Sequence, residues 1–311
     1  MVSRVTVVTP SYNQARFLPA TLKSVLSQDY PAIEYIVVDG GSTDGSVDII
    51  RGVSHRLAWW VSEKDSGQAE AINKGMARAK GEYVAWLNSD DVYLPGAVRN
   101  AVKILDGHPD VGLVHANGLI IDQDGRIEHR PRGRQVSLVD LLAMSILHQP
   151  TVFMRRGLYE RAGGLDPTYH LLLDHRLWIR MAAQTRFHFS EEYWASARRH
   201  GAAKNSARGL EFAEEAARLH QELEAVPEIA ALLDTNLLTV RAGRLLFEAG
   251  YLAAAGDKGG ALKSLARALL ADPRRGRQCA KLALLAIARG SPKAERVLYA
   301  VRDWVVRSRY P

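Results

Sequence analysis

The stretch VVTPSYNQARFLPATLKSVLSQDYPAIEYIVVDGGSTDGS, residues 7–46, alternates between two patterns. The apolar runs at residues 4–9 and 34–39 are continuous and rich in β-branched side chains, which is typical of strands buried on both faces. Between them, Leu18, Leu22 and Val25 recur at helical spacing. A strand, a helix and a second strand in this order predict the start of a parallel sheet covered by helices.

The alternation of strand and helix continues further along the chain. Helical patterns at residues 46–51 and 68–79 alternate with apolar runs at residues 57–61 and 83–87. We therefore expect an α/β fold with a mostly parallel central sheet and helices on both faces. Beyond this region the sequence predicts a hairpin that turns at residues 123–125, strands at 111–116, 119–122, 126–129, 151–154 and 186–190, and a helix at 174–184.

Strand patterns vanish after about residue 205. We expect one domain over residues 1–205 and an all-helical region over 206–311, with helices at 211–224, 229–249, 258–271, 277–289 and 293–309. Residues 241–274 resemble a single tetratricopeptide-like unit, although a plain helical hairpin fits the same pattern.

The charge of the 311-residue chain is unevenly distributed. The net charge is +7, but residues 258–311 carry +10 and residues 1–257 carry −3. The single cysteine, Cys279, excludes an internal disulfide, and the N-terminus lacks the pattern of a signal peptide. These features predict a cytoplasmic protein whose basic C-terminal segment attracts phosphates or anionic lipid.

Polar clusters follow each of the first four predicted strands. They are TPSYN at residues 9–13, DGGSTDG at 39–45, EKDSGQ at 63–68 and NSDD at 88–91. Each cluster alone is compatible with ordinary turn chemistry. Four clusters at the carboxyl ends of parallel strands instead predict a ligand site at that edge of the sheet.

The adjacent carboxylates Asp90 and Asp91 are the most informative pair in these clusters. They repel each other unless a cation or strong donors lie nearby. Mg²⁺ or Mn²⁺ bound by oxygen ligands, phosphate and water would relieve this repulsion. A solvated turn that caps the helix beginning near Gly96 is the alternative. The chain contains no GxGxxG sequence after the first strand, which argues against a dinucleotide-binding Rossmann domain, and it contains no P-loop sequence.

Together these segments resemble family 2 glycosyltransferases of the GT-A fold. The resemblance covers roughly residues 3–206 and rests on the stretch quoted above and on four further segments: SEKDSGQAEAINKGMARAKGEYVAWLNSDDVYLPGA, HQPTVFMRR, GGLDPTYHLLLDHRLWIRMA and RRHGAAKN. It implies a GT-A-type sheet, an inverting transfer of a sugar from a nucleotide-diphosphate donor, and a divalent cation, Mn²⁺ or Mg²⁺.

The resemblance also implies roles for individual residues. Nucleotide-binding residues are implied at Thr9, Ser11, Tyr12, Asp39, Asp65, Ser89 and Asp90. Asp90 matches the last residue of the family's DxD motif, whose first Asp is Asn88 here, and this departure makes Asp91 a second candidate for the cation. His200 is implied as a further metal ligand.

Asp174 matches the second residue of the family's "ED" motif and is implied as the general base, with Leu173 in place of the acidic residue before it. A helix N-cap is the alternative role for Asp174. Gln149 and Lys204 are implied on the acceptor or diphosphate side.

The resemblance thus implies a metal-assisted, inverting glycosyltransferase that uses a UDP-sugar and acts on a glycan or lipid-linked saccharide in cell-surface polysaccharide synthesis. Two alternatives stay open, a sugar-phosphate nucleotidyltransferase and a non-catalytic nucleotide-sugar-binding protein. We expect no nucleic-acid partner. Peripheral contact with an anionic membrane through residues 258–311 is expected from the helical spacing of Leu298, Val301 and Trp304 among arginines. Packing of this segment on the protein is the alternative.

Overall fold

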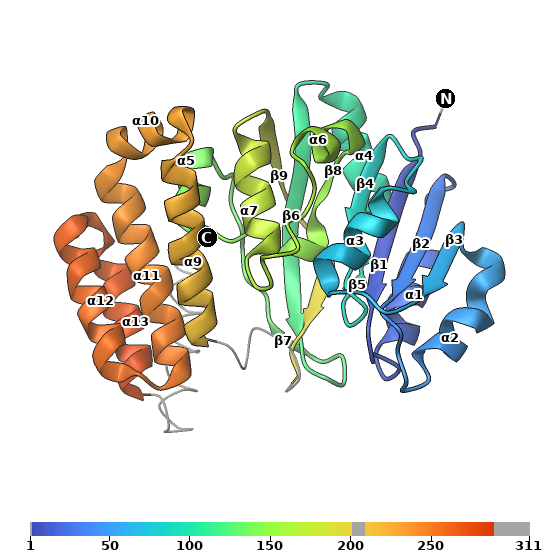
Figure 1. Cartoon of the computed structure of the whole chain (residues 1–311), viewed down its shortest axis with the longest axis horizontal. Coiled ribbons are helices and arrows are strands. Elements are labelled where there is room, and N and C mark those ends of the chain that lie inside the picture. The colour runs from blue at the N-terminus through green and yellow to red at the C-terminus, as the bar shows by residue number, and fades with distance from the viewer. Residues whose placement is uncertain (1, 201–208, 289–311) are drawn as a thin grey trace. The chain divides into compact units, whose positions relative to one another are not determined.

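The computed structural model describes residues 2–200 and 209–288. The chain divides into two compact units, of which the first comprises residues 1–138 and 146–200 and the second residues 139–145 and 201–311. The first unit is an α/β domain and the second is helical (Figure 1). The sequence-based division at residue 205 did not place residues 139–145 with the helices.

The first unit contains all the strands of the described chain. They are β1 (Val5–Ser11), β2 (Ile33–Asp39), β3 (Trp59–Ser62), β4 (Tyr83–Trp86), β5 (Val92–Tyr93), β6 (Val111–Ile121), β7 (Ile127–His129), β8 (Phe153–Arg155) and β9 (Arg186–Arg198). Its α-helices are α1 (Leu18–Leu26), α2 (Ser46–Val53), α3 (Gln68–Met76), α4 (Ala97–Gly107), α6 (Arg156–Arg161) and α7 (Leu173–Ala182). Two short 3₁₀ helices, η1 (Ser54–Arg56) and η2 (Gln149–Thr151), complete it.

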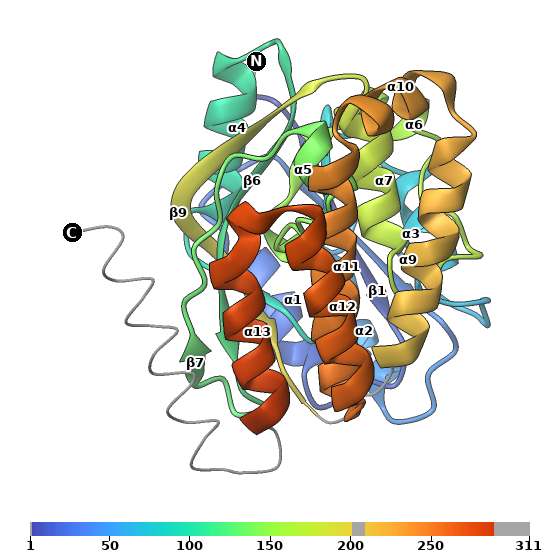
Figure 2. The same cartoon turned by 90° about the vertical axis from the view of Figure 1, so that its left-hand side faces the viewer.

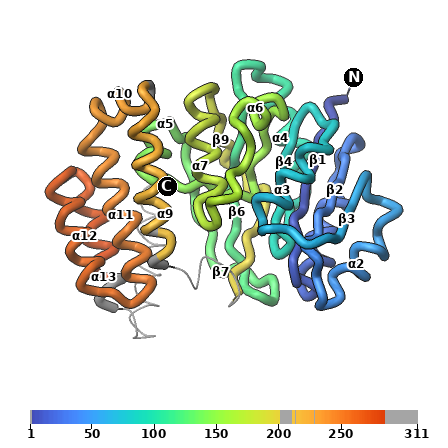
Figure 3. Tube along the Cα trace, viewed as in Figure 1, coloured from blue at the N-terminus to red at the C-terminus, as the bar shows by residue number. Residues whose placement is uncertain are grey.

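These strands form one sheet in the order β3-β2-β1-β4-β8-β6-β9-β5, with β7 paired to β6. The strands from β3 to β4 are parallel, β8 is antiparallel to both β4 and β6, and β6 is parallel to β9. The predicted fold class is therefore confirmed, with antiparallel pairs added in the second half. The close pairing of β6 and β9 is visible in the chain trace (Figure 3).

The structure changes two predicted strands. Residues 111–116 and 119–122 were expected as separate strands, but they form the single strand β6, whose register against β9 shifts near Asn117. Asn117 and the following Gly118 interrupt the strand pattern in the sequence, but in the structure the bulge keeps the strand paired. The predicted hairpin with residues 126–129 is confirmed by the antiparallel pairing of β6 with β7.

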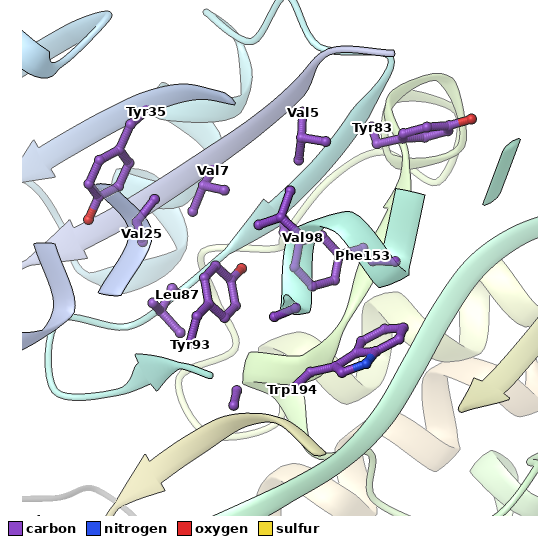
Figure 4. Close-up of a cluster of buried hydrophobic side chains, with 14 of the residues drawn as sticks. Val5, Val7, Val25, Tyr35, Tyr83, Leu87, Tyr93, Val98, Phe153 and Trp194 are labelled. Atoms are coloured by element: carbon purple, nitrogen blue, oxygen red, sulfur yellow. The ribbon is translucent and has the colours of Figure 1, made fainter. Parts of the chain in front are cut away.

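Side chains that alternate along the central strands pack against helices on opposite faces of the sheet. Val5 and Val7 lie in the main core with Val25 and Val98, which come from α1 and α4 (Figure 4). On the other face, α3 lies so close to the sheet that a Cβ on Gly75 would come 2.5 Å from Val8 Cγ1. The glycine therefore sets how closely α3 approaches β1.

The second unit is built from α5 (Leu138–Leu142), α9 (Gly209–Glu224), α10 (Pro227–Thr235), α11 (Leu237–Ala255), α12 (Lys258–Ala271), η3 (Pro273–Arg275) and α13 (Gly276–Ala288). Helices α11, α12 and α13 stack side by side (Figure 2) around a small core that includes Leu246 and Leu265. The helix expected over residues 229–249 is wrong, because the chain breaks at Asn236 between α10 and α11. The expected helix at 293–309 lies outside the described residues.

The segment Val139–Ser145 is fixed inside this helical unit. His220 of α9 is buried, and its Nε2 lies 2.9 Å from the carbonyl oxygen of Leu142. Gly243 of α11 contacts the backbone of Ala143, where a larger side chain would collide with it. Among the described residues, none of the helices is both long enough and apolar enough to cross a bilayer.

Candidate functional site

Three parallel strands of the first unit end in the same row of the sheet. Ser11 at the end of β1 pairs with Asp39 at the end of β2, and Asp39 pairs with Ser62 at the end of β3. The carboxyl ends of parallel strands share one edge, so the loops that follow them gather there. The structure therefore places the implied nucleotide loops together along this edge.

Asp39 organises the turn that follows β2. Its Oδ2 accepts hydrogen bonds from the backbone N–H groups of Gly41 (3.1 Å) and Ser42 (2.9 Å) and from the hydroxyl of Ser62 (2.7 Å). Its Oδ1 accepts one from the hydroxyl of Ser42 (2.6 Å). Four donors occupy most of the acceptor capacity of a carboxylate, and the residue is fully buried. The described contacts thus give Asp39 a structural role, and its implied role in nucleotide binding stays a prediction.

The loop after β1 contains three implied nucleotide-binding residues with different exposures. Thr9 is buried, and its hydroxyl lies 2.9 Å from that of Tyr35. Ser11 is also buried, and its hydroxyl has no hydrogen-bond partner within the described parts of the chain. Tyr12 is 62% exposed. Of the three side chains, that of Tyr12 is the most accessible to a ligand.

Asp65 lies in the loop between β3 and α3 and packs against the Asp39 turn. Its Oδ1 accepts a hydrogen bond from the backbone N–H of Gly67 at 3.0 Å. A Cβ on Gly40 would come 2.9 Å from Asp65 Oδ2, so this glycine allows the two loops to touch. Burial raises the pKa of Asp65 above its ordinary value.

Asp91 is held inside the loop that follows β4. Its Oδ1 accepts a hydrogen bond from the backbone N–H of Arg198 at 2.9 Å, and its Oδ2 lies 3.4 Å from Asn88 Nδ2. Its carbonyl oxygen accepts a 2.7 Å hydrogen bond from the Thr21 hydroxyl. Burial, and then the neighbouring carboxylate of Asp90, raise the pKa of Asp91 well above its ordinary value. These contacts indicate a structural role for this carboxyl.

Asp90 forms a pair with His200. Ser89, the implied nucleotide-binding residue beside it, is buried. Asp90 Oδ2 lies 3.0 Å from His200 Nε2. Two neighbouring ligands of an octahedral cation, each at about 2.1 Å, are about 3 Å apart, so the pair fits Mg²⁺ or Mn²⁺ completed by phosphate and water. Within residues 2–200 and 209–288, no group of three or more His, Cys, Asp or Glu side chains is placed to hold a metal. The predicted trio with Asp91 is thus reduced to this pair.

Asn88, which replaces the first acid of the motif, belongs to a chain of amide side chains. Its Oδ1 accepts a hydrogen bond from Gln68 Nε2 at 2.7 Å, and its Nδ2 donates to Gln149 Oε1 at 3.2 Å. Gln149 Nε2 in turn donates to the carbonyl oxygen of Trp86 at 2.9 Å. The implied acceptor-side residue Gln149 therefore lies at the end of β4, tied to the same loop as Asp90.

Asp174 lies in the first turn of α7. Leu172 occupies the N-cap position, so the N-cap role considered for Asp174 is wrong. Its Oδ1 accepts a hydrogen bond from the backbone N–H of His175 at 2.7 Å, and burial raises the pKa of Asp174 to about 6. One turn later, Trp178 stacks on Trp86 with ring centroids 5.2 Å apart, which fixes α7 to the end of β4.

Sequence reasoning missed two residues that organise these loops. Arg198 lies in the segment RRHGAAKN, from which no role was predicted for it, although its position two residues before His200 was the available signal. No role was predicted for Asn73 of α3, but its side chain binds the loop before α7. Its Nδ2 donates to the carbonyl oxygen of Leu165 at 2.7 Å. The implied residue Lys204 lies outside the described residues.

Comparison with known proteins adds a family match. The sequence model of Glycosyl transferase family 2 matches residues 6–163. An uncharacterized glycosyltransferase of Rickettsia typhi is 29% identical over 208 residues, which are 64% of this chain and 64% of that protein. An uncharacterized glycosyltransferase of Mycobacterium tuberculosis is 35% identical over 185 residues, covering 57% of this chain and 68% of that protein. The chain thus spans less than two thirds of the Rickettsia relative.

Two solved structures share the fold. S. aureus TarS in complex with UDP-GlcNAc has a TM-score of 0.62 at 17% identity and covers 95% of this chain and 89% of that chain. The mannosyltransferase PcManGT of Pyrobaculum calidifontis, in complex with GDP-Man and Mn²⁺, has a TM-score of 0.52 at 22% identity, covering 98% of this chain and 81% of that chain. At these identities the likeness concerns the fold, and it confirms the predicted GT-A-type architecture.

Proposed function

Because the chain belongs to glycosyl transferase family 2, we propose that it is a glycosyltransferase, which transfers a sugar from a UDP-sugar to a hydroxyl of a glycan or lipid-linked saccharide. The transfer inverts the anomeric carbon and is assisted by Mn²⁺ or Mg²⁺. Family membership argues against the nucleotidyltransferase kept as an alternative above. The non-catalytic binding protein stays open until transfer is measured.

The observation that carries this proposal is the pair formed by Asp90 and His200 at the edge where the nucleotide loops gather. Their oxygen and nitrogen atoms, 3.0 Å apart, would hold the cation. When bound, the cation neutralises charge that develops on the leaving diphosphate. The structural neighbours with UDP-GlcNAc and with GDP-Man and Mn²⁺ support a nucleotide-sugar donor and a divalent cation.

Asp174 supplies the base in this proposal. A carboxyl with a pKa of about 6 is ionised at neutral pH and still basic enough to accept a proton from the acceptor hydroxyl. The acceptor oxygen then forms the new bond to the anomeric carbon while the bond to the diphosphate breaks, and the diphosphate leaves with the electron pair. A single displacement of this kind inverts the configuration.

A panel of nucleotide sugars tests the proposal. We expect UDP-sugars to raise the melting temperature, and Mn²⁺ to increase that shift in the wild type but not in Asp90→Ala. Asp124→Ala is the matched control, because Asp124 is an exposed acid paired with Arg16. Release of UDP in the presence of saccharide acceptors then measures transfer. Stabilisation by GDP-sugars instead would overturn the assignment of the nucleotide, and an Asp90→Ala variant that responds to Mn²⁺ like the wild type would remove Asp90 from the site.

We propose further that the exposed face of α12 binds peripherally to the surface of an anionic membrane. Leu262, Leu269 and Leu270 are 40%, 42% and 83% exposed, and exposed basic residues flank them at Lys258, Lys263 and Arg267. Apolar side chains among basic ones are typical of helices at a membrane interface. A lipid-linked acceptor, which is among the acceptor classes proposed above, would itself lie in a membrane.

Co-sedimentation with phosphatidylserine vesicles at low and high salt tests this surface. The wild type should sediment at low salt and be released at high salt, because charge attraction is screened over about 10 Å at 0.1 M salt. The double variant Leu269→Glu/Leu270→Glu should stay in solution. Leu237→Glu/Leu238→Glu, at exposed leucines of α11, is the control and should sediment like the wild type. Equal sedimentation of both variants would overturn the proposal.

A further inference from the structure

Arg198, at the end of β9, connects the loop of Asp90 to the hairpin between β6 and β7. Its Nε donates a hydrogen bond to the carbonyl oxygen of Asp90 at 2.9 Å, and its backbone N–H donates to Asp91 Oδ1 at 2.9 Å. Its Nη1 donates to the carbonyl oxygens of Asp122 at 3.1 Å and Gln123 at 3.3 Å. One side chain thus fixes two loops that are far apart in the sequence.

The ring of Phe17 joins Arg198 to His200. The guanidinium carbon of Arg198 lies 5.1 Å from the centroid of the Phe17 ring, and the centroid of the His200 ring lies 4.7 Å from it. Phe17 is 8% exposed and precedes α1 as its N-cap residue. The cation–π contact and the contact between the rings together restrict the orientations open to His200.

We propose that Arg198 is a positioning residue that holds the carboxylate of Asp90 and the imidazole of His200 together as a preformed metal-binding pair. This inference rests on the proposed function, in which the two side chains bind Mn²⁺ or Mg²⁺. Arg198 fixes Asp90 through the carbonyl oxygen of Asp90. It fixes His200 through the ring of Phe17 and through the single residue, Arg199, that lies between them in the chain. Groups that orient metal ligands in this way affect metal affinity without touching the metal.

The contacts require an arginine at this position. Its planar guanidinium has several N–H donors at fixed angles, so Nε and Nη1 serve three carbonyl oxygens while the flat face contacts Phe17. A lysine has the same charge, but its single ammonium group cannot reproduce this arrangement. Arg199 next to it carries the same charge, is exposed, and pairs with Glu128 at 3.6 Å. It is therefore a matched control for the loss of charge.

The test measures Mn²⁺ binding and UDP binding separately. Mn²⁺ affinity is read from the paramagnetic resonance of free Mn²⁺ in the presence of UDP, and UDP affinity is read by calorimetry in EDTA. We expect Arg198→Gln and Arg198→Lys to weaken Mn²⁺ binding about tenfold to a hundredfold, with little change in the Kd of UDP in EDTA. Phe17→Leu should shift Mn²⁺ affinity in the same direction by less. Arg199→Gln should match the wild type in both measurements.

Each other result overturns the inference in a recognisable way. Unchanged Mn²⁺ affinity in Arg198→Gln and Phe17→Leu would show that the pair is assembled without Arg198. A loss of UDP binding in EDTA equal to the loss of Mn²⁺ binding would assign Arg198 to the nucleotide or to general folding. An equal effect in Arg199→Gln would reduce the role to charge. A wild type that does not bind Mn²⁺ in the presence of UDP would overturn the metal part of the proposed function, and this inference with it.

Discussion

Asp39 lies among the loops implied to bind the nucleotide, the nucleotide side of the site. Asp174, the proposed general base, lies on what we call the base side. Both belong to the same domain, but their surroundings differ. Asp39 accepts hydrogen bonds from Gly41, from Ser42 twice and from Ser62. The described contact of Asp174 is a hydrogen bond from the next backbone N–H, and burial raises the pKa of Asp174 to about 6. The two carboxyls thus differ in the number of donors that face them, and a desolvated carboxyl with few donors, such as that of Asp174, holds its proton more tightly.

This difference separates aspartates that build the site from an aspartate suited to proton transfer. On the nucleotide side, carboxylates replace water as acceptors for the backbone N–H groups of tight turns. On the base side, desolvation brings a carboxyl closer to neutral pH, where it exchanges protons efficiently. The substitutions below should therefore have different effects on activity and on stability in the two regions.

The largest expected effect is the loss of turnover in Asp174→Asn. The amide keeps the shape of the side chain but cannot accept the proton, so kcat should fall by roughly 10²-fold to 10⁴-fold. Donor affinity should stay near the wild-type value, because the substitution leaves the nucleotide loops intact. Because the base must be ionised, kcat/KM of the wild type should decline below about pH 6.

Steady-state kinetics at saturating acceptor, together with donor affinity by calorimetry, check this prediction. Asp48→Asn serves as the control, since Asp48 is an exposed aspartate in the first turn of α2, paired with Arg51. If Asp174→Asn retains most of the wild-type kcat, another group accepts the proton and the contrast between the two regions has no catalytic meaning.

Asp39→Asn should act mainly on stability. The amide offers one acceptor oxygen in place of two, and its NH₂ group faces donors from Ser42 or Ser62. Leaving such buried groups unpaired should lower the free energy of unfolding by about 2–4 kcal/mol. Urea unfolding of the variant and of Asp48→Asn measures this. A variant that is as stable as the wild type but binds UDP much more weakly would instead show that Asp39 binds the nucleotide, as the family resemblance implies.

The nucleotide side was largely predictable from the sequence. Continuous apolar strands ending in Gly, Asp and Ser predicted both the parallel sheet and the edge where its loops gather, because strand and turn signals are local. What Asp39 does there was not predictable, since its partner Ser62 comes from a neighbouring strand. The pairing of Asp90 with His200 was not predictable from local sequence patterns either, because the two residues lie far apart in the chain. Only the family resemblance implied that both bind the metal.

The later part of the chain was less predictable because its structure depends on distant contacts. Strand β9 was expected to end at residue 190, but it continues to Arg198 through the exposed polar residues Glu191 and Glu192. Pairing with β6 keeps this stretch extended. The insertion of residues 139–145 into the helical unit has no local signal either, because it depends on burial against His220 and Gly243.

Asn73 connects the two regions, and its removal should have an intermediate effect. Its Oδ1 accepts hydrogen bonds from the backbone N–H of Leu165 at 3.0 Å and from the hydroxyl of Tyr159 at 2.5 Å. Asn73→Ala leaves these groups and the Leu165 carbonyl without a partner, so the free energy of unfolding should fall by about 2 kcal/mol. The loop before α7 should loosen, and kcat should fall more than donor affinity.

Tyr159→Phe is the matched control for Asn73→Ala, because it removes one hydrogen bond and keeps the link to Leu165. It should retain most of the stability and nearly all of the turnover. Equal losses in the two variants would mean that the tyrosine, and not the link between α3 and the loop, supports the base side. Unfolding in urea and steady-state kinetics on both variants distinguish these outcomes.

The smallest expected effect is a pH-dependent difference in stability between the wild type and Asp174→Asn. The pKa of Asp174 is raised from 3.8 to about 6 in the folded protein, so the folded state binds this proton more tightly than the unfolded state does. The stabilisation that results is fully present below about pH 4 and is lost as the pH rises through 6. Between pH 5 and pH 8 the wild type should therefore lose about 1 kcal/mol relative to Asp174→Asn. Urea unfolding of both proteins at the two pH values gives this difference directly, because all other titrating groups are shared and cancel. A difference of zero would mean that the carboxyl of Asp174 is solvated like that of an ordinary surface aspartate. The comparison with Asp39 would then have no basis, and the physical reason for assigning Asp174 the role of general base would be lost.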